Sequence, residues 1–109
     1  VRNWLHAQDT SDAVITIIKN MDAHVVNNIF NIAGICAQTN LDTVKKIITE
    51  YDSSLNYSNY LDLSYSRQGQ DVRYALNDSK LRGLGWKPVH LFDCELSNIV
   101  NYYKEKFIW

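Results

Sequence analysis

Arginine is concentrated in one stretch of the chain, and it is the side chain best suited to hold phosphate or carboxylate. Three of the four arginines lie close together, at Arg67, Arg73 and Arg82, whereas most other positive charge comes from lysine. A guanidinium presents a planar fork of donors that forms two parallel bonds to an anion, which the ammonium of lysine cannot do. Gly69 permits a positive φ, so the backbone beside Arg67 can turn close to a ligand. The stretch predicts either an anion site or a plain glycine turn between two strands.

Metal and thiol chemistry are not indicated by the histidines and cysteines. His6, His24 and His90 do not match the spacing of a ligand motif, so we expect no metal site. Cys36 and Cys94 are too few and too far apart in the sequence for a metal-binding pair. We interpret them as buried free thiols in a reducing cytoplasm.

Length, charge and hydropathy describe one small domain. The chain has 109 residues, enough to bury roughly two-thirds of its unfolded surface around a modest core. A net charge of −1 and a pI near 6.3 argue against a general nucleic-acid binder, which carries a broad basic excess. The sequence starts at Val1 and shows neither a charged-then-apolar leader nor a long apolar span. We therefore expect a soluble cytoplasmic fragment of a larger protein, with no membrane contact and one domain over residues 1–109.

Hydrophobic periodicity in the first half predicts two helices and two short strands. A strand is expected within residues 1–6, and Asp9 or Thr10 then caps a helix. The apolar positions of this helix, which we expect to face inward, are Ala13, Val14, Ile17, Ile18 and Met21. A buried strand is predicted at 28–32, broken at Gly34, and Asn40 is the predicted N-cap of the second helix. The apolar positions of the second helix are Leu41, Val44, Ile47, Ile48 and Tyr51.

The second half predicts a loop, two more strands and two more helices. Residues 52–59 have the polar composition of a surface loop, and residues 61–66 alternate as a half-buried strand that ends at Arg67. Another strand is predicted at 72–76, followed by a brief helix from Asn77 or Asp78 that Gly83 closes in the left-handed conformation. Trp86 is a predicted core anchor. The last helix begins near Phe92 or Asp93 and carries a stripe formed by Leu96, Ile99, Val100, Tyr103 and Phe107.

The fold class that follows is mixed α/β, an α+β domain with three or four helices and several short strands. The four glycines cannot form the Gly-x-Gly-x-x-Gly turn that sets a pyrophosphate on a helix N-terminus. No alternating βαβ series is long enough for a dinucleotide fold. We therefore expect no Rossmann half in this chain and no cofactor bound by it.

Three blocks of sequence occur in a fixed order along the chain. The first reads VRNWLH at positions 1–6, the second FNIAG at 30–34, and the third RQGQDVRYA at 67–75, followed by LGWKP at 84–88. In this order the blocks resemble the carboxy-terminal, substrate-binding part of the nucleotide-sugar 4,6-dehydratases, especially those acting on dTDP-glucose. These enzymes are extended short-chain dehydrogenase/reductases. The resemblance covers nearly the whole chain.

The resemblance implies a function and a set of binding residues. In the parent reaction NAD oxidises the sugar at C4, water leaves across C5 and C6, and the hydride returns to C6. The arginines at the positions of Arg2 and Arg67 hold the diphosphate of the nucleotide sugar in such enzymes, and the asparagine matching Asn31 contacts the same ligand. With Gln70 and Tyr74 these residues form the expected substrate-binding set. The implied partners are a nucleotide diphosphate sugar and an N-terminal dinucleotide-binding half that this chain lacks.

Two departures from the family pattern affect that expectation. These enzymes commonly have Arg-Pro-Gly-His-Asp where this chain reads RQGQD at 67–71, so the fixed φ of proline is lost and Gln70 replaces an ionisable histidine. Asn3 replaces the usual aspartate beside Arg2. A nucleotide-sugar epimerase is therefore an alternative parent. A non-enzymatic interaction module that binds RNA through Arg67, Arg73 and nearby tyrosines is the competing class, although the acidic balance argues against it.

One catalytic-looking pair is interpreted as coincidence. Tyr102 and Lys106 have the Tyr-x-x-x-Lys spacing of the short-chain dehydrogenase catalytic pair, but they follow the blocks that this pair should precede. Paired carboxylates such as Asp9 and Asp12 are better explained as helix-start charges, because carboxylates stabilise that end of a helix. We expect no catalytic residue in this chain and no activity from it alone. Without its other half, it should expose apolar surface and self-associate.

Overall fold

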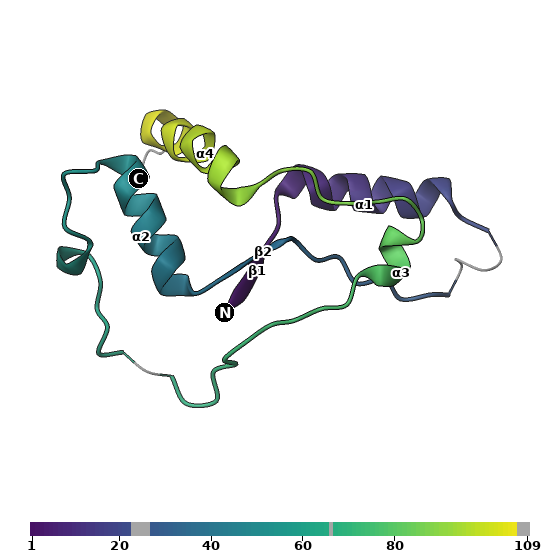
Figure 1. The fold of residues 1–109 in the computed structure, drawn as a ribbon, viewed down its shortest axis with the longest axis horizontal. Helices are drawn as coiled ribbons and strands as arrows, with labels where there is room; N and C mark the ends of the chain where they lie inside the picture. Colours follow the sequence, from purple (N-terminus) through teal and green to yellow (C-terminus); the bar gives the residue numbers. More distant parts are fainter. Residues whose placement is uncertain (23–26, 66, 107–109) are drawn as a thin grey trace.

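The computed structural model describes residues 1–22, 27–65 and 67–106 as a mixed α/β domain (Figure 1). Its elements in chain order are β1 (Arg2–Trp4), α1 (Ala7–Lys19), β2 (Cys36–Gln38), α2 (Asn40–Tyr51), the 3₁₀ turn η1 (Tyr57–Asn59), α3 (Ser79–Arg82) and α4 (Phe92–Lys106). The predicted fold class is confirmed, with four α-helices and one two-stranded sheet in the described residues. None of these parts is a Rossmann half.

The sheet joins the start of the chain to the segment before α2. Strands β1 and β2 pair antiparallel, with Asn3 opposite Ala37 and Trp4 opposite Cys36. Gly34 is required just before β2, because a Cβ there would lie 1.9 Å from the carbonyl oxygen of Trp4. The backbone can cross β1 at this distance only without a side chain.

Helix α1 begins at a different cap from the predicted one. The ring nitrogen Nδ1 of His6 accepts a hydrogen bond from the Gln8 N–H at 3.1 Å, so His6 is the N-cap. Asp9 and Thr10, the predicted caps, lie within the first turn instead. Only part of the predicted inward face is covered. Ala13 is fully buried and Ile17 half-buried, whereas the other three positions, Val14, Ile18 and Met21, are exposed.

Helices α2 and α4 pack against each other, although they are far apart in the sequence. Thr39, one residue before the predicted Asn40, caps α2: its hydroxyl accepts from the Asp42 N–H at 3.0 Å and donates to the Asp42 carboxylate. At the other end of α2, the Lys104 ammonium donates to the carbonyl oxygen of Tyr51 at 2.7 Å. The predicted start of α4 at Phe92 is confirmed, and Phe107 lies outside the described residues.

The core sits between α1, α3 and the segment that follows α3. Its buried members are Ala13, Leu81 and Trp86, which confirms Trp86 as an anchor. Half-buried side chains surround them: Leu5, Ile17, Phe30, Ile32 and Leu84. The radius of gyration is 17.4 Å, well above the roughly 13 Å typical of a compact domain of this size. The molecule is therefore elongated around a small core.

Three predicted strands are wrong. Residues 28–32, 61–65 and 72–76 are irregular, and residue 66 lies outside the described part of the chain. The alternation at 61–65 does not bury a face, because Leu63 is 70% and Tyr65 78% exposed. A half-buried strand needs a neighbouring strand, and these segments have none in the described residues. In Figure 1 the connection from η1 to α3 runs as a long loop below the helices.

Two further local predictions need correction. Gly83 ends α3 with φ −62°, a right-handed conformation, and the positive φ falls on Gly85 at 92° and on Gly69 at 73°. The left-handed residue therefore comes two positions later than predicted, whereas the positive φ expected at Gly69 is confirmed. The thiols are free but not buried: Cys36 is half-buried and Cys94 exposed.

Candidate functional site

Two of the five predicted binding residues, Arg2 and Tyr74, meet at a small groove beside β1. This Arg2 groove has a volume of about 540 Å³. Its lining residues are Arg2, Asn3, Trp4, Ile32, Ala33, Asn40, Tyr74 and Leu76. Arg2 is the only charged side chain among these lining residues. The rest of the lining consists of two amides, one phenol and apolar side chains.

Arg2 and Tyr74 form the centre of the Arg2 groove. The guanidinium carbon of Arg2 lies 4.3 Å from the centroid of the Tyr74 ring, a cation–π contact. Its Nη1 donates to the carbonyl oxygen of Asp71 at 3.3 Å. The Tyr74 N–H donates in turn to the carbonyl oxygen of Val1 at 3.1 Å. These contacts hold the loop at 71–74 against the beginning of the chain.

The pKa of the Tyr74 hydroxyl is shifted by its neighbours. It donates to the Asp71 carboxylate, and this bond, together with the charge of Asp71, raises the pKa of Tyr74 above its ordinary value of 10.0. The charges of Arg2 and Arg67 lower that pKa by less. At neutral pH the phenol is uncharged, and the Asp71 carboxylate is already engaged.

The other predicted binding residues lie outside the groove lining. Asn31 is exposed, and its amide nitrogen donates to the carbonyl oxygen of Asn77 at 3.0 Å. Gln70 and Arg67 are exposed in the loop that follows residue 66. The structure thus brings together Arg2 and Tyr74 and leaves the other three residues outside the groove lining.

Sequence reasoning missed the pair formed by Asp9 and His90. The Asp9 side chain is 1% exposed, and its oxygens accept from the backbone N–H groups of Val89 and His90, each at 3.1 Å. The Nδ1 atom of His90 lies 2.8 Å from the same carboxylate. The Asp9 carbonyl oxygen accepts from the indole N–H of Trp86 at 3.1 Å. Asp9 was correctly predicted in the first turn of a helix, but no local signal shows that its partners come from residues 86–90.

The protonation states of this pair are coupled. Burial raises the pKa of the Asp9 carboxyl, but the bonds from the His90 ring and from the two backbone N–H groups outweigh it and leave the pKa below 3.8. The bond to Asp9 raises the pKa of His90 above 6.5, although desolvation opposes it. The ring of His6 stacks on His90 with centroids 4.4 Å apart. We interpret the pair as a structural clamp between α1 and residues 86–90.

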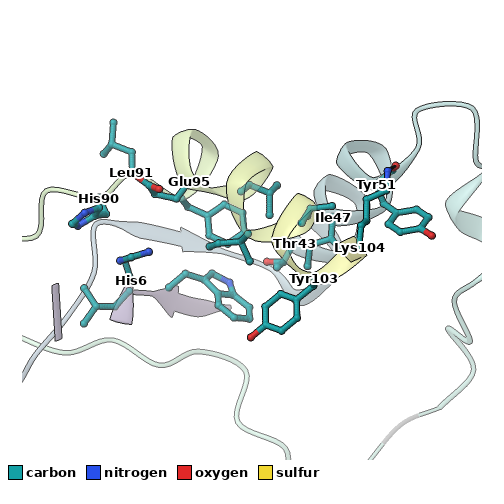
Figure 2. Close-up of a pocket in the computed structure, with 15 residues that line it drawn as sticks. His6, Thr43, Ile47, Tyr51, His90, Leu91, Glu95, Tyr103 and Lys104 are labelled. Atoms are coloured by element: carbon teal, nitrogen blue, oxygen red, sulfur yellow. Dashed lines mark hydrogen bonds between the residues drawn. The ribbon is translucent and has the colours of Figure 1, made fainter. Parts of the chain in front are cut away.

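A second, larger groove lies between β1, α2 and α4, and Figure 2 shows it in close-up. This α2–α4 groove has a volume of about 590 Å³. His6 and His90 stand at one end of it in Figure 2, and Tyr51 and Lys104 at the other. Between these ends the walls are mainly apolar and include Trp4, Leu5, Ile47, Leu91, Phe92, Leu96, Ile99 and Val100. None of the predicted binding residues lines it.

The described residues hold neither a metal-binding cluster nor a membrane-spanning helix. No group of three or more His, Cys, Asp or Glu side chains there is arranged to hold a metal ion. No helix in the same residues is long and apolar enough to cross a membrane. Tyr102 and Lys106 both lie exposed near the end of α4.

Curated proteins similar to this chain include several dTDP-glucose 4,6-dehydratases. dTDP-glucose 4,6-dehydratase from Neisseria gonorrhoeae is 30% identical over 112 residues, which cover 94% of this chain and 32% of that protein. dTDP-glucose 4,6-dehydratase 1 from Escherichia coli K12 is 29% identical, covering 100% of this chain and 31% of the relative. Low-salt glycan biosynthesis protein Agl12 from Haloferax volcanii is 29% identical, with 94% and 31% covered.

The remaining comparisons set the limits of that similarity. No protein-family model and no solved structure matches the chain. The chain spans about a third of the length of the curated relatives it matches. The resemblance found in its three sequence blocks is confirmed. Over nearly its whole length, the chain is a homologue of a segment that makes up about a third of the dTDP-glucose 4,6-dehydratases.

Proposed function

We propose that this chain binds the diphosphate of a nucleotide sugar, as the substrate-binding part of an NAD-dependent nucleotide-sugar 4,6-dehydratase. The observation that carries the proposal is the cation–π contact between Arg2 and Tyr74 in the Arg2 groove. Arg2 is one of the two arginines assigned to the diphosphate by family resemblance, and Arg67 is the other. The names of the relatives support the same substrate class.

The charge of Arg2 is available to a ligand. Within the described residues Arg2 donates only to the backbone carbonyl oxygens of Val1 and Asp71 and forms no ion pair. The Asp71 carboxylate is bonded to the Tyr74 hydroxyl. A charge-assisted hydrogen bond contributes about 1.5–3 kcal/mol, so two arginines can give useful affinity for a diphosphate.

The residues of this chain do not fit NAD. The described sheet is a single antiparallel pair, and the sequence holds no glycine-rich turn for a pyrophosphate. We therefore assign the cofactor to the remainder of the parent protein, where it would supply hydride transfer. The role of this chain is to bind and orient the sugar nucleotide. Positioning of this kind can account for several kcal/mol of a reaction barrier.

The test is calorimetric titration of the chain with dTDP and with thymidine. We expect dTDP to bind and thymidine, which lacks phosphate, to bind far more weakly. Arg67→Ala and Arg2→Ala should each reduce dTDP affinity roughly 10- to 100-fold, the equivalent of one charge-assisted bond. Arg82→Ala is the matched control, because Arg82 already pairs with Asp78 at 2.9 Å and does not line the Arg2 groove, so this variant should leave affinity unchanged.

Equal affinity of the wild type and Arg67→Ala would show that Arg67 is not a phosphate ligand. A chain that binds neither compound contradicts the proposal as a whole. An RNA titration at increasing salt tests the competing interaction module, since phosphate-driven RNA binding must weaken steeply with salt. Tight, salt-sensitive RNA binding without dTDP binding would favour that module.

A further inference from the structure

Tyr74 contacts a cation with its ring and an anion with its hydroxyl. The guanidinium carbon of Arg2 lies 4.3 Å from the ring centroid, and the hydroxyl donates to the Asp71 carboxylate. The face of an aromatic ring attracts a cation, whereas the phenol proton at the ring edge suits an anionic acceptor. One side chain therefore holds two opposite charges at two separate positions.

Arg2 and Asp71 are close together, yet they do not form an ion pair. Nη1 of Arg2 donates to the backbone carbonyl oxygen of Asp71 at 3.3 Å, so the guanidinium lies beside this residue. The ion pairs formed by the described residues do not include Arg2 with Asp71. In the same part of the chain, the Asp71 carboxylate has a single hydrogen-bond partner, the Tyr74 hydroxyl. That bond is also the largest cause of the raised pKa of Tyr74.

An ion pair between Arg2 and Asp71 would compete with a ligand phosphate for the guanidinium. Both anions seek the same N–H donors, and a carboxylate paired there also cancels much of the charge that attracts a phosphate. Resting on the proposed function, in which Arg2 binds the diphosphate, we infer that the Tyr74 hydroxyl keeps Arg2 free for that anion by holding the Asp71 carboxylate away from it. Tyr74 is then a positioning residue, which acts on the ligand through Asp71 and Arg2.

The Tyr74 hydroxyl is already engaged and cannot also donate to a phosphate. A phenol has one proton to donate, and here the Asp71 carboxylate accepts it. A direct bond to the ligand would require the hydroxyl to release Asp71, which could then turn to Arg2. Direct contact and the positioning role therefore predict opposite results for a variant that lacks both the hydroxyl and the carboxylate.

Calorimetric titration with dTDP separates these two roles. Tyr74→Phe keeps the ring under Arg2 and removes only the hydroxyl. We expect its dTDP affinity to fall roughly three- to fivefold, the effect of one partly exposed ion pair that the ligand must break. Asp71→Asn removes the competing charge and should bind dTDP at least as tightly as the wild type. The double variant Tyr74→Phe/Asp71→Asn should recover the affinity that Tyr74→Phe loses.

Tyr57→Phe is the matched control for the loss of a phenol hydroxyl. Tyr57 also carries a cation on its ring, with the Lys45 ammonium 4.7 Å from the ring centroid. It lies outside the Arg2 groove, so its variant should bind dTDP as the wild type does.

Nuclear magnetic resonance provides a second measurement, without ligand. Guanidinium N–H protons move downfield when a carboxylate accepts from them, because charge-assisted bonds are shorter and stronger. We expect the side-chain N–H signals of Arg2 to move downfield in Tyr74→Phe and to return in the double variant. Arg2→Lys identifies these signals by their loss. The signals show where the Asp71 carboxylate lies whether or not dTDP binds.

Three results would overturn the inference. Unchanged dTDP affinity in Tyr74→Phe, or Arg2 signals that do not move, shows that the carboxylate stays away from Arg2 without the hydroxyl. Equal losses of affinity in Tyr74→Phe and in the double variant assign the hydroxyl to the ligand itself. Weaker binding by Asp71→Asn than by the wild type shows that Asp71 supports binding. A wild type that does not bind dTDP contradicts the proposed function instead, and the Arg2 signals then decide the position of Asp71.

Discussion

At the scale of single residues, the buried Asp9 side chain joins α1 to residues 89 and 90. A carboxylate buried to this extent is costly unless its oxygens are bonded, and here two backbone N–H groups and an imidazole satisfy them. The sequence indicated a helix cap or a helix-start charge for Asp9, and neither predicts these partners. Its partners are about eighty residues away, and no periodicity or propensity carries information over that separation.

The Asp9–His90 pair predicts a pH dependence of stability. The pKa of His90 is raised in the folded chain, so the stabilisation is complete below the unfolded value of 6.5 and is lost as pH rises through the folded value. Urea denaturation should therefore give a higher free energy of unfolding at pH 6 than at pH 8.

His90→Gln should be less stable at pH 6 and should lose most of this difference. A wild-type chain equally stable at both pH values would contradict the assignment. The lowered pKa of Asp9 adds an acid limb, because its stabilisation is present above pH 3.8 and lost as pH falls through the folded value.

At the scale of elements, the helices and the first strand, β1, were predictable, and the other strands were not. Helices α1, α2 and α4 follow local apolar spacing, so their residues were placed correctly to within a few positions. A strand depends on a partner that comes from elsewhere in the chain. Residues 61–65 alternate as a strand should, but nothing described pairs with them. The same limit applies to the site. Arg2 and Tyr74 were both expected to bind the ligand, but only the structure shows that the two side chains contact each other.

Gly34 controls the pairing of β1 and β2. Gly34→Ala would place a Cβ 1.9 Å from the Trp4 carbonyl oxygen, so the backbone must move and the pair must open. We expect a loss of about 1–3 kcal/mol in the free energy of unfolding, measured by urea denaturation.

Gly83→Ala is the matched control, since Gly83 has right-handed backbone angles that alanine adopts and its Cβ would lie 3.3 Å, not 1.9 Å, from the nearest carbonyl oxygen. It should cost much less stability than Gly34→Ala. Similar losses for both variants would show that the crossing at Gly34 is not tight.

At the scale of the whole molecule, the described residues bury few large apolar side chains. Both α1 and the α2–α4 groove leave such side chains in contact with solvent. We expect self-association of the isolated chain, seen by light scattering as an average mass that rises above 12.6 kDa with concentration. A constant monomer mass at millimolar concentration would contradict this expectation.

The isolated chain should also be catalytically inactive with NAD and dTDP-glucose in excess. Hydride transfer needs a nicotinamide held against the sugar carbon, and this chain lacks the glycine turn that would bind the cofactor. The 4-keto product is followed by its absorbance in alkali. Turnover that disappears in Tyr102→Phe would make Tyr102 and Lys106 a true catalytic pair and overturn our interpretation of them.

Contacts between the first ten residues and residues 74–90 affect when the chain can fold. Val1 bonds to Tyr74, and Asp9 bonds to Val89 and His90, so the core closes only by bringing together residues separated by most of the sequence. Closing such long loops costs entropy before any contact repays it, which slows folding. During synthesis, Asp9 of α1 therefore cannot reach its partners until residue 90 has left the ribosome. Until then the apolar side chains of α1 are available to chaperones.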